Sequence, residues 1–390
     1  MVRQLWASDG RQGTLPLVRR NPSFQWTLTS GRPEETVPAA PGGEIATPLG
    51  SEVRWVGGTT LVMELRPKDD RKAHLLTRGN VDGIVSAALF LAHDPNVKVT
   101  FVPSGDMAVD VLRKDISSQE FFLVDLGLTP RLVKTLNDKA KTRQKVTYLD
   151  HHEQSELQLD GLDQDMEGVV RQGVSAAGVA YDYLGLNGDH RHLVALADLV
   201  EYCESPLLND VTRAVGVERL EEEARMLDFA WRYRVDDDRF RYQAARRLAS
   251  GRWPSEVAEV KSRYLQMVNE HRWDRALDRV RERVELKHNV ALLRFGRHKT
   301  SLFGFGSRAL TEVAKQMGAS VAVMLNRRNN LSSLSMRATG LDPDSFNLGQ
   351  FVSDFTAQHG IVGGGHPNSA GAKIPTSSVP EFLHEVYCFA

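Results

Sequence analysis

The stretch VTYLDHHE, residues 146–153, joins a short apolar segment to an acid and two imidazoles. Its first four residues are β-branched, aromatic or aliphatic, which is typical of a buried β-strand. Asp150, His151 and His152 follow directly, although such groups are seldom buried without partners. A buried strand that ends in these three groups therefore indicates that they bind a common ligand. The flanking segments indicate which kind of ligand this is.

The flanking segments alternate between strand-like and helix-like patterns. Apolar, β-branched runs predict strands in residues 74–80, 97–104, 120–125 and 145–150. Helices are predicted in residues 82–93, 107–115, 130–141, 174–185 and 190–205. Strands joined by helices of this length form right-handed crossovers in a parallel sheet. The fold class is therefore α/β, with a parallel-sheet N-terminal catalytic domain that we place at residues 71–217.

The rest of the chain divides around this domain. Residues 1–70 are an extension, rich in Pro and Gly at 30–52 and with a predicted β-hairpin at 53–65, and we interpret it as a small β-rich cap. Residues 218–285 are helical and charge-rich, which is typical of a solvated connector. Residues 286–390 combine strand-like runs with a helix and predict a smaller C-terminal α/β domain with a mixed sheet.

Composition excludes several classes of protein. The formal net charge is −1, so no global basic field attracts long nucleic acid, whereas a short anionic substrate needs only a few local cations. The two cysteines, Cys203 and Cys388, lie far apart in sequence and fit a reducing compartment without disulfides. We find neither the apolar core of a signal peptide nor an apolar run of about 18 residues. The expected location is the cytoplasm, without a membrane partner.

Three predicted strands end close to acids: Asp82, Asp125 and Asp150. The carboxyl ends of parallel strands share one edge of the sheet, where ligands bind. A fourth acid, Asp198, lies in the apolar helix LVALADLVEY, where an unpaired carboxylate would be costly. A divalent cation would stabilise the ionised carboxylates and offset their mutual repulsion. Carboxylates with imidazoles suit Mn²⁺, Mg²⁺ or Fe²⁺ better than a structural Zn²⁺.

Each of these residues has an ordinary explanation when it is taken alone. Asp82 or Asp125 would serve as a helix N-cap or a turn residue. The adjacent histidines would lie on the surface, and Asp198 would face solvent on an amphipathic helix. It is their joint occurrence at strand ends, within one alternating pattern, that favours a metal site.

These motifs resemble those of the DHH-family phosphoesterases, which include nano-RNases, single-strand-specific exonucleases and exopolyphosphatases. The triplet that names the family is Asp150-His151-His152. The nuclease-like branch has a C-terminal companion domain with a glycine-rich histidine motif, and GIVGGGHPNSAGAKIP at residues 360–375 is similar to it. The resemblance covers residues 72–385 and implies a two-domain phosphoesterase.

The resemblance also implies roles for individual residues. One metal would be held by Asp82, Asp125, His151 and Asp198. Asp150 would orient its neighbours, and His152 would face the scissile phosphate. The family's first motif, His-x-Asp-x-Asp-Gly, appears here with Arg78 in place of the histidine and Asn80 in place of the first aspartate. Asn80 still offers a neutral oxygen to a cation, whereas an arginine cannot ligate one.

This departure predicts one strong site for Mn²⁺, Mg²⁺ or another divalent cation, with the second site weakened or absent. Arg78 would then clamp phosphate oxygens and replace part of the lost positive charge. The metal would activate water for in-line attack on phosphorus, with His152 and Arg78 neutralising the non-bridging oxygens.

Substrate binding is assigned to the C-terminal domain. Gly363, Gly364 and Gly365 permit close backbone approach to an anion, and His366 and Asn368 follow them. Arg337 matches the arginine that reaches toward substrate in the family. Arg297, His298 and Lys299 beside Phe303 and Phe305 form either a base-binding surface or a polar hairpin over core phenylalanines.

The sequence therefore predicts a metal-dependent phosphodiesterase that hydrolyses short single-stranded oligonucleotides or linear dinucleotides to mononucleotides. One alternative is an exopolyphosphatase or another phosphohydrolase of small substrates. A second is a nucleotide-binding regulator with weakened catalysis, since the first metal motif is altered. A homodimer is left open.

Overall fold

The computed structural model describes residues 72–390, except 143, 157, 296–301, 329, 342–345 and 362, together with five short strands within residues 1–71. The chain forms two compact units, residues 1–71 and residues 72–390. In the first unit β1 (Gln4–Trp6) pairs with β2 (Gln12–Thr14), and β3 (Trp26–Thr27), β4 (Val53–Val56) and β5 (Thr60–Met63) form a second antiparallel sheet. The pairing of β4 with β5 confirms the predicted hairpin.

The second unit begins with a five-stranded sheet in the order β10-β9-β8-β6-β7, in which every neighbouring pair is parallel. Its strands are β6 (Ala73–Thr77), β7 (Lys98–Phe101), β8 (Glu120–Val124), β9 (Lys145–Asp150) and β10 (Glu167–Val170). The predicted α/β fold is confirmed. The edge strand β10 was not predicted, because its four residues are largely exposed and lack an alternating apolar pattern.

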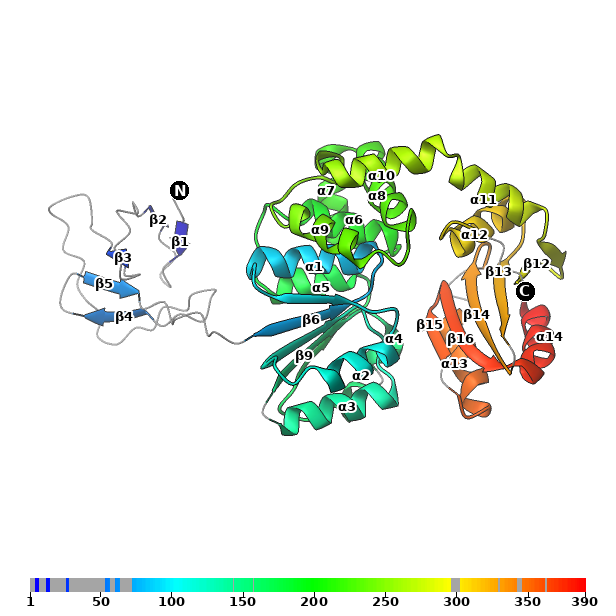
Figure 1. Ribbon diagram of the computed structural model, residues 1–390, viewed down its shortest axis with the longest axis horizontal. Helices are drawn as coiled ribbons and strands as arrows, with labels where there is room; N and C mark the ends of the chain where they lie inside the picture. Colours follow the sequence, from blue (N-terminus) through cyan, green and yellow to red (C-terminus); the bar gives the residue numbers. More distant parts are fainter. Residues whose placement is uncertain are drawn as a thin grey trace. The chain divides into compact units, whose positions relative to one another are not determined.

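Helices cover both faces of this sheet (Figure 1). On one face lie α1 (Val81–His93), α5 (Ala176–Tyr183) and α6 (Arg191–Val200), and on the other lie α2 (Gly105–Lys114) and α3 (Pro130–Lys141). Successive strand residues point to opposite faces, so Leu75 joins the core under α1 and Leu76 the core under α2. The short α4 (Glu153–Glu156) and η1 (Leu159–Gly161) follow β9.

Residues 218–285 are helical as predicted, but the prediction of a solvated connector was wrong. Helix α7 (Pro206–Val215) precedes this segment. The segment contains α8 (Val217–Arg232), α9 (Asp238–Leu248), η2 (Pro254–Glu256), α10 (Ala258–Asn269) and α11 (Arg272–Arg281). Leu220 and Leu227 of α8 and Phe240 of α9 are buried in the same core as α1. The apolar residues of each helix form a narrow stripe, which the surrounding charges conceal in the sequence.

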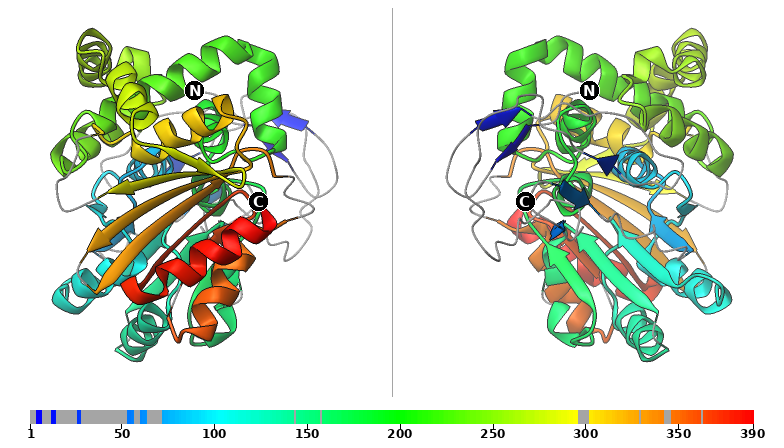
Figure 2. Two further views of the ribbon diagram at one scale, coloured as in Figure 1. Left: turned by 90° about the vertical axis from the view of Figure 1, so that its right-hand side faces the viewer. Right: turned by 90° about the vertical axis from the view of Figure 1, so that its left-hand side faces the viewer.

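The chain ends in a six-stranded mixed sheet in the order β11-β12-β13-β14-β16-β15. Its strands are β11 (Glu285–Lys287), β12 (Val290–Phe295), β13 (Val321–Arg328), β14 (Leu331–Ala338), β15 (Gly363–His366) and β16 (Ser369–Pro375). Of its pairs, β12 with β13 is parallel and the others are antiparallel. One face packs on α11 and α12 (Gly306–Gln316), and the other on α13 (Leu348–Gln358) and α14 (Val379–Phe389), which η3 (Thr376–Ser378) precedes (Figure 2). The predicted mixed sheet is confirmed.

Among the described residues, none of the helices has both the length and the apolar character that a membrane span requires.

A buried polar network ties β6 to the end of α2. His74 contacts Asp115 through Nδ1 at 2.6 Å and Thr100 through Nε2 at 2.8 Å. Burial lowers the pKa of His74 below its ordinary value of 6.5. The folded protein therefore takes up a proton at lower pH than the unfolded chain does, so the free energy of unfolding falls as the pH drops through 6.5.

Between pH 7 and pH 5 we expect this residue to remove up to about 2 kcal/mol from the free energy of unfolding. His74→Gln lacks the titrating group and should give a flatter pH dependence, although it is less stable than the wild type at pH 7. Urea unfolding of both proteins at several pH values measures the difference. Parallel stability curves would contradict the assignment.

Candidate metal and phosphate site

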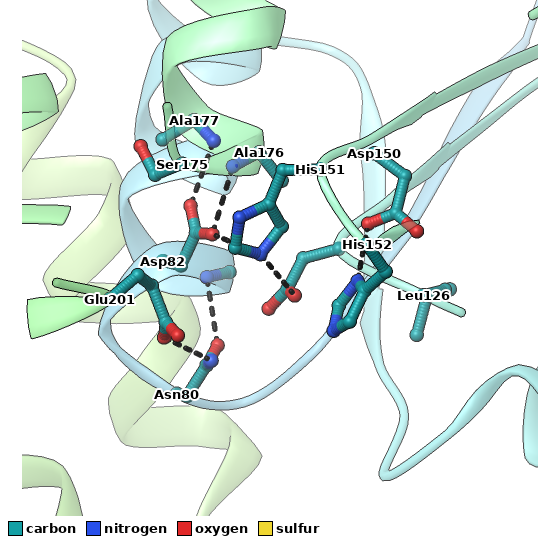
Figure 3. Close-up of polar contacts among 12 residues, drawn as sticks. Asn80, Asp82, Leu126, Asp150, His151, His152, Ser175, Ala176, Ala177 and Glu201 are labelled. Atoms are coloured by element: carbon teal, nitrogen blue, oxygen red, sulfur yellow. Dashed lines mark hydrogen bonds and ion pairs between the residues drawn. The ribbon is translucent and has the colours of Figure 1, made fainter. Parts of the chain in front are cut away.

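The order of the strands brings distant residues together at one edge of the parallel sheet. Because β6, β8 and β9 are neighbours, their carboxyl ends bring Asp82 and Asp125 close to the triplet that begins at Asp150. Figure 3 shows Asp82 beside His151. Asp82 lies in the first turn of α1, and Asp125 directly follows β8. These groups are deeply buried, with exposed fractions of 0% for Asp82, 1% for Asp125 and 4% for His151.

His151 lies between two carboxylates. Its Nε2 is 3.7 Å from Asp82 Oδ2 and 3.8 Å from Asp125 Oδ1, too far for hydrogen bonds. His151 Nε2 and Asp125 Oδ2 are buried and have no hydrogen-bond partner among the described residues. Ligand atoms of Asp125, Asp150, His151 and His152 lie within 4.8 Å of one another. Orphaned imidazole and carboxylate atoms within such a group fit a divalent cation.

The charges at this edge of the sheet also call for a cation. Burial and the neighbouring Asp125 raise the pKa of Asp82 well above its ordinary value. Burial lowers the pKa of His151, but the adjacent Asp125 and other neighbours outweigh it and raise that pKa well above 6.5. Two buried carboxylates thus depend on a positive charge between them, which a divalent ion supplies more fully than one proton does.

Backbone geometry fixes both carboxylates. Asp82 accepts hydrogen bonds from the amides of Ala177 at 2.7 Å and Ala176 at 3.0 Å, in the first turn of α5. Asp125 has a φ of 57°, in the left-handed region that few non-glycine residues adopt and that aspartate and asparagine tolerate better than most. Non-glycine residues in this region cluster at functional sites, where the surrounding fold holds them in place.

Asp198, the fourth predicted ligand, has both oxygens engaged by serines. Its Oδ1 accepts from the backbone and hydroxyl of Ser175, at 2.8 Å and 2.6 Å, and its Oδ2 accepts from the hydroxyl of Ser205. The structure therefore brings Asp82, Asp125 and His151 together, and Asp198 holds the start of α5, whose amides orient Asp82. This indirect support is not visible in sequence, because it depends on contacts between separate helices. The role of Asp198 as a metal ligand stays a prediction.

Asp150 orients His152 and is itself held by hydroxyl groups. Its Oδ1 lies 2.8 Å from His152 Nδ1, and its Oδ2 accepts from Tyr148 and Ser155, each at 2.6 Å. Burial raises the pKa of Asp150, but His152 and the other donors outweigh it and keep that pKa well below its ordinary value. The ionised carboxylate fixes the imidazole of His152 through its Nδ1.

The altered first motif has a different use here. Asn80 caps α1, accepting from the amide of Gly83 at 2.9 Å, and its Nδ2 donates to Glu201 Oε1 at 3.2 Å. The side chain predicted as a metal ligand is therefore engaged in a cap and a bond to an acid. Arg78 lies in the field of Asp125 above all, and also of Glu201, and its pKa is raised. Its fixed positive charge stands where the family motif has an imidazole.

The C-terminal domain reaches into this site through His366. The His366 ring stacks on His152 at 4.7 Å between centroids and lies 4.9 Å from His151. Burial, then the charges of His152 and His151, lower the pKa of His366 to about 3, so the ring is neutral. Its Nε2 is buried without a partner among the described residues.

Strand register places Arg337 beside His366. Arg337 of β14 is paired with Ser369, and Ser369 is paired with His366, so the three side chains emerge on the same face of the sheet. Burial lowers the pKa of Arg337, and Glu201 and Tyr202 counteract it. Neither Arg337 nor Arg78 has a hydrogen bond or ion pair within the described parts of the chain.

The glycines of residues 363–365 form an edge strand rather than a loop. A Cβ on Gly363 would lie 2.6 Å from Ala372 Cβ and 2.7 Å from Thr356 Cγ2, so α13 packs directly on β15. Asn368 lies in the exposed turn between β15 and β16, and its carbonyl accepts from the amide of Ala338. Whether the amides of Gly363, Gly364 and Gly365 bind an anion stays a prediction.

Comparison with known proteins identifies the architecture. Residues 305–389 match the model of the DHHA1 domain. The solved DHH domain of a protein described as a member of a family of ribosomal proteins superposes with a TM-score of 0.58 and 14% identity, covering 82% of this chain and 86% of that one. The fold is that of the solved DHH domain. No curated protein matches the sequence.

A second solved DHH-type structure is RecJ from Thermus thermophilus in complex with Mn²⁺. It superposes on this chain with a TM-score of 0.54 and 15% identity, covering 82% of this chain. The match covers only 52% of RecJ, so this chain spans about half the length of that relative. The resemblance noted in the sequence is therefore confirmed at the level of the DHHA1 domain and the DHH fold.

The predicted aromatic and cationic surface of the DHHA1 region is described in part. Arg297, His298 and Lys299 lie outside the described residues. Phe305 is fully buried against Phe229 and Trp273. This agrees with the alternative prediction, in which the phenylalanines belong to the core.

Sequence reasoning missed Arg241 of α9, which holds the motif loop of the DHH domain. Its Nε donates to the carbonyl of Gly79 at 2.9 Å, and its other nitrogens donate to Asp238 and to the carbonyl of Val235. The guanidinium is buried, and a Cβ on Gly79 would lie 2.5 Å from its Nε. Arg241 is therefore a positioning residue for the loop that carries Arg78 and Asn80.

We expect Arg241→Met to lower the free energy of unfolding by about 1–3 kcal/mol, since it leaves the part-buried carbonyls of Gly79 and Val235 without this donor. The shifted loop should also reduce kcat about tenfold while Mn²⁺ affinity changes little, and Arg241→Lys should recover part of the loss. Arg246→Met, an exposed position on the same helix, is the matched control. If Arg241→Met and Arg246→Met had the same kcat and the same free energy of unfolding, a positioning role for Arg241 would be contradicted.

Proposed function

We propose that this protein is a metal-dependent phosphodiesterase that hydrolyses short oligonucleotides or linear dinucleotides to mononucleotides. The observation that carries the proposal is the pair of orphaned atoms, His151 Nε2 and Asp125 Oδ2, beside arginines that are unpaired within the described chain, at one edge of the sheet. A site with ligand atoms for a cation and free donors for an anion suits a metal-assisted reaction at phosphorus. The DHH fold and the DHHA1 domain support the same class of reaction.

Asp82, Asp125 and His151 would hold the cation. Their carboxylate and imidazole atoms suit Mn²⁺, which is the ion in the RecJ complex. A bound divalent cation would activate a water nucleophile and neutralise the charge that builds on the phosphoryl oxygens.

The side chains around the cation would bind and orient the phosphate. Asp150 directs His152 Nε2 toward the substrate, and the neutral His366 offers a second imidazole 4.7 Å away. Arg78 from the DHH domain and Arg337 from the DHHA1 domain supply guanidinium donors, which bind phosphate oxygens in pairs. These fixed donors would stabilise the charge of the transition state without reorganisation.

The altered motif supports a single strong cation site. Asn80 donates its amide to Glu201 and caps α1, while Arg78 places a permanent positive charge in the same region. We therefore expect one tightly bound Mn²⁺ per chain after dialysis, measured by elemental analysis of the native protein. Two tightly bound ions per chain would contradict this part of the proposal.

The decisive assay compares a labelled dinucleotide, a longer single-stranded oligomer and tripolyphosphate in the presence of Mn²⁺. Preferred cleavage of the dinucleotide to mononucleotides supports the proposal, and preferred cleavage of tripolyphosphate supports an exopolyphosphatase. The loss of the imidazole and carboxylate at Arg78 and Asn80 favours a third candidate, a nucleotide-binding regulator. Binding of all three compounds without turnover of any would support that candidate and refute the hydrolase.

A further inference from the structure

An exposed aromatic ring stands at the end of α6, where the chain turns into the site. Tyr202 is 76% exposed, and its ring contacts no other ring among the described residues. Its φ is 59°, a left-handed conformation that is unfavourable for a residue with a large side chain and that glycine or asparagine adopts readily. An exposed tyrosine is ordinary, but one held in a strained conformation calls for a reason.

Both sequence neighbours of Tyr202 belong to the site. Glu201 accepts a hydrogen bond from Asn80 at 3.2 Å, and Cys203 lies against His151, whose pKa it affects. The backbone is also pinned, since the amides of Tyr202 and Cys203 donate to the carbonyls of Leu199 and Asp198. The backbone that carries the ring is therefore held at a defined place beside the metal and phosphate site.

A guanidinium of the DHHA1 domain lies in the electrostatic field of this segment. Glu201 and Tyr202 both affect the pKa of Arg337. Arg337 makes no hydrogen bond or ion pair with any residue that the structure describes. A site that has both an unpaired guanidinium and an exposed, unstacked aromatic ring matches the two ends of a nucleotide, which are an anion and a flat base.

We propose that Tyr202 is the base-stacking residue of this site and that its ring selects nucleotides over phosphate substrates that lack a base. The inference rests on the proposed function for the reaction at phosphorus and adds to it the residue that selects substrates with a base. A polyphosphate chain has no flat surface and would gain nothing from the ring. Stacking tolerates every base, so the selection is for a nucleoside rather than for a sequence.

The test measures, by calorimetry, the equilibrium binding of two probes to the full chain in the presence of Mn²⁺. The probes are adenosine 5′-monophosphate and ribose 5-phosphate. Tyr202→Asn removes the ring and suits the left-handed backbone, so the variant should unfold at the same temperature as the wild type or higher. It should bind the nucleotide about 5- to 100-fold more weakly, since stacking on one base is of this size. Its affinity for ribose 5-phosphate should stay within about twofold, as should both affinities of Tyr202→Phe.

Three results would overturn the inference. They are an unchanged nucleotide affinity in Tyr202→Asn, an equal loss for both probes, and wild-type protein that binds the two probes equally. The test does not require turnover. If no diester is cleaved, the proposed function fails, while selective loss of nucleotide binding in Tyr202→Asn would still support the role of the ring.

Discussion

Asp125→Asn is expected to reduce hydrolysis of a dinucleotide by at least about 1000-fold, the scale of losses seen when a residue central to catalysis is removed. Asp125 is almost fully buried, faces His151 Nε2 at 3.8 Å and has one oxygen without a partner in the described chain. Asparagine keeps the shape and tolerates the φ of 57°, so the backbone should not change. What it removes is the negative charge that binds the cation.

The readout that does not depend on activity is Mn²⁺ affinity, measured by calorimetry or electron paramagnetic resonance. Asp125→Asn should weaken the Mn²⁺ affinity by about 100-fold or more. The loss of a carboxylate that contacts the cation lowers the affinity more than the loss of a residue that only supports a ligand. Asp115→Asn is the matched control, because it makes the same chemical change at a buried aspartate that contacts His74 rather than the triplet. Wild-type metal affinity in Asp125→Asn would remove this residue from the metal site.

Asp150→Asn is expected to lower kcat by about 100- to 10,000-fold, the range seen when an acid that orients a catalytic histidine becomes an amide. Asp150 lies 2.8 Å from His152 Nδ1, and an amide at that place no longer holds the imidazole in one orientation and tautomer. Mn²⁺ affinity should change much less than kcat, because the role of Asp150 runs through His152.

A double-mutant cycle separates this role from a structural one. If Asp150 acts through His152, the pair Asp150→Asn with His152→Ala should be no slower than His152→Ala alone. Ser155→Ala removes another partner of Asp150, whose hydroxyl donates at 2.6 Å, without touching the imidazole, and should cost far less activity. Additive effects of the two changes would refute the orienting role.

Much of the fold of the DHH domain could be predicted, because its strands and helices are visible in short stretches of sequence. The runs that became β6, β8 and β9 have apolar, β-branched residues, and the rule for parallel strands places their carboxyl ends together. That rule alone brings Asp82, Asp125 and His151 to one edge. His366 is different, since only the resemblance to a family motif linked it to the triplet.

What could not be predicted depends on contacts between distant segments. The charges on α8 and α9 conceal the buried stripe around Leu227, so packing on α1 was not visible in the sequence. The contacts of Asp198 were also not visible in sequence, because nothing in its own helix reveals the hydroxyls of Ser175 and Ser205. Arg241 is one of many arginines in a charged helix, and only the fold shows that it holds Gly79, 162 residues away in sequence.

The stacked rings of His152 and His366 join the two domains directly at the triplet. At 4.7 Å between centroids, the rings are in van der Waals contact and leave no room for a ligand between them. A ligand that contacts both imidazoles must therefore approach their edges, where the ring nitrogens lie. Because one ring belongs to each domain, the geometry of the site depends on how the two domains pack against each other.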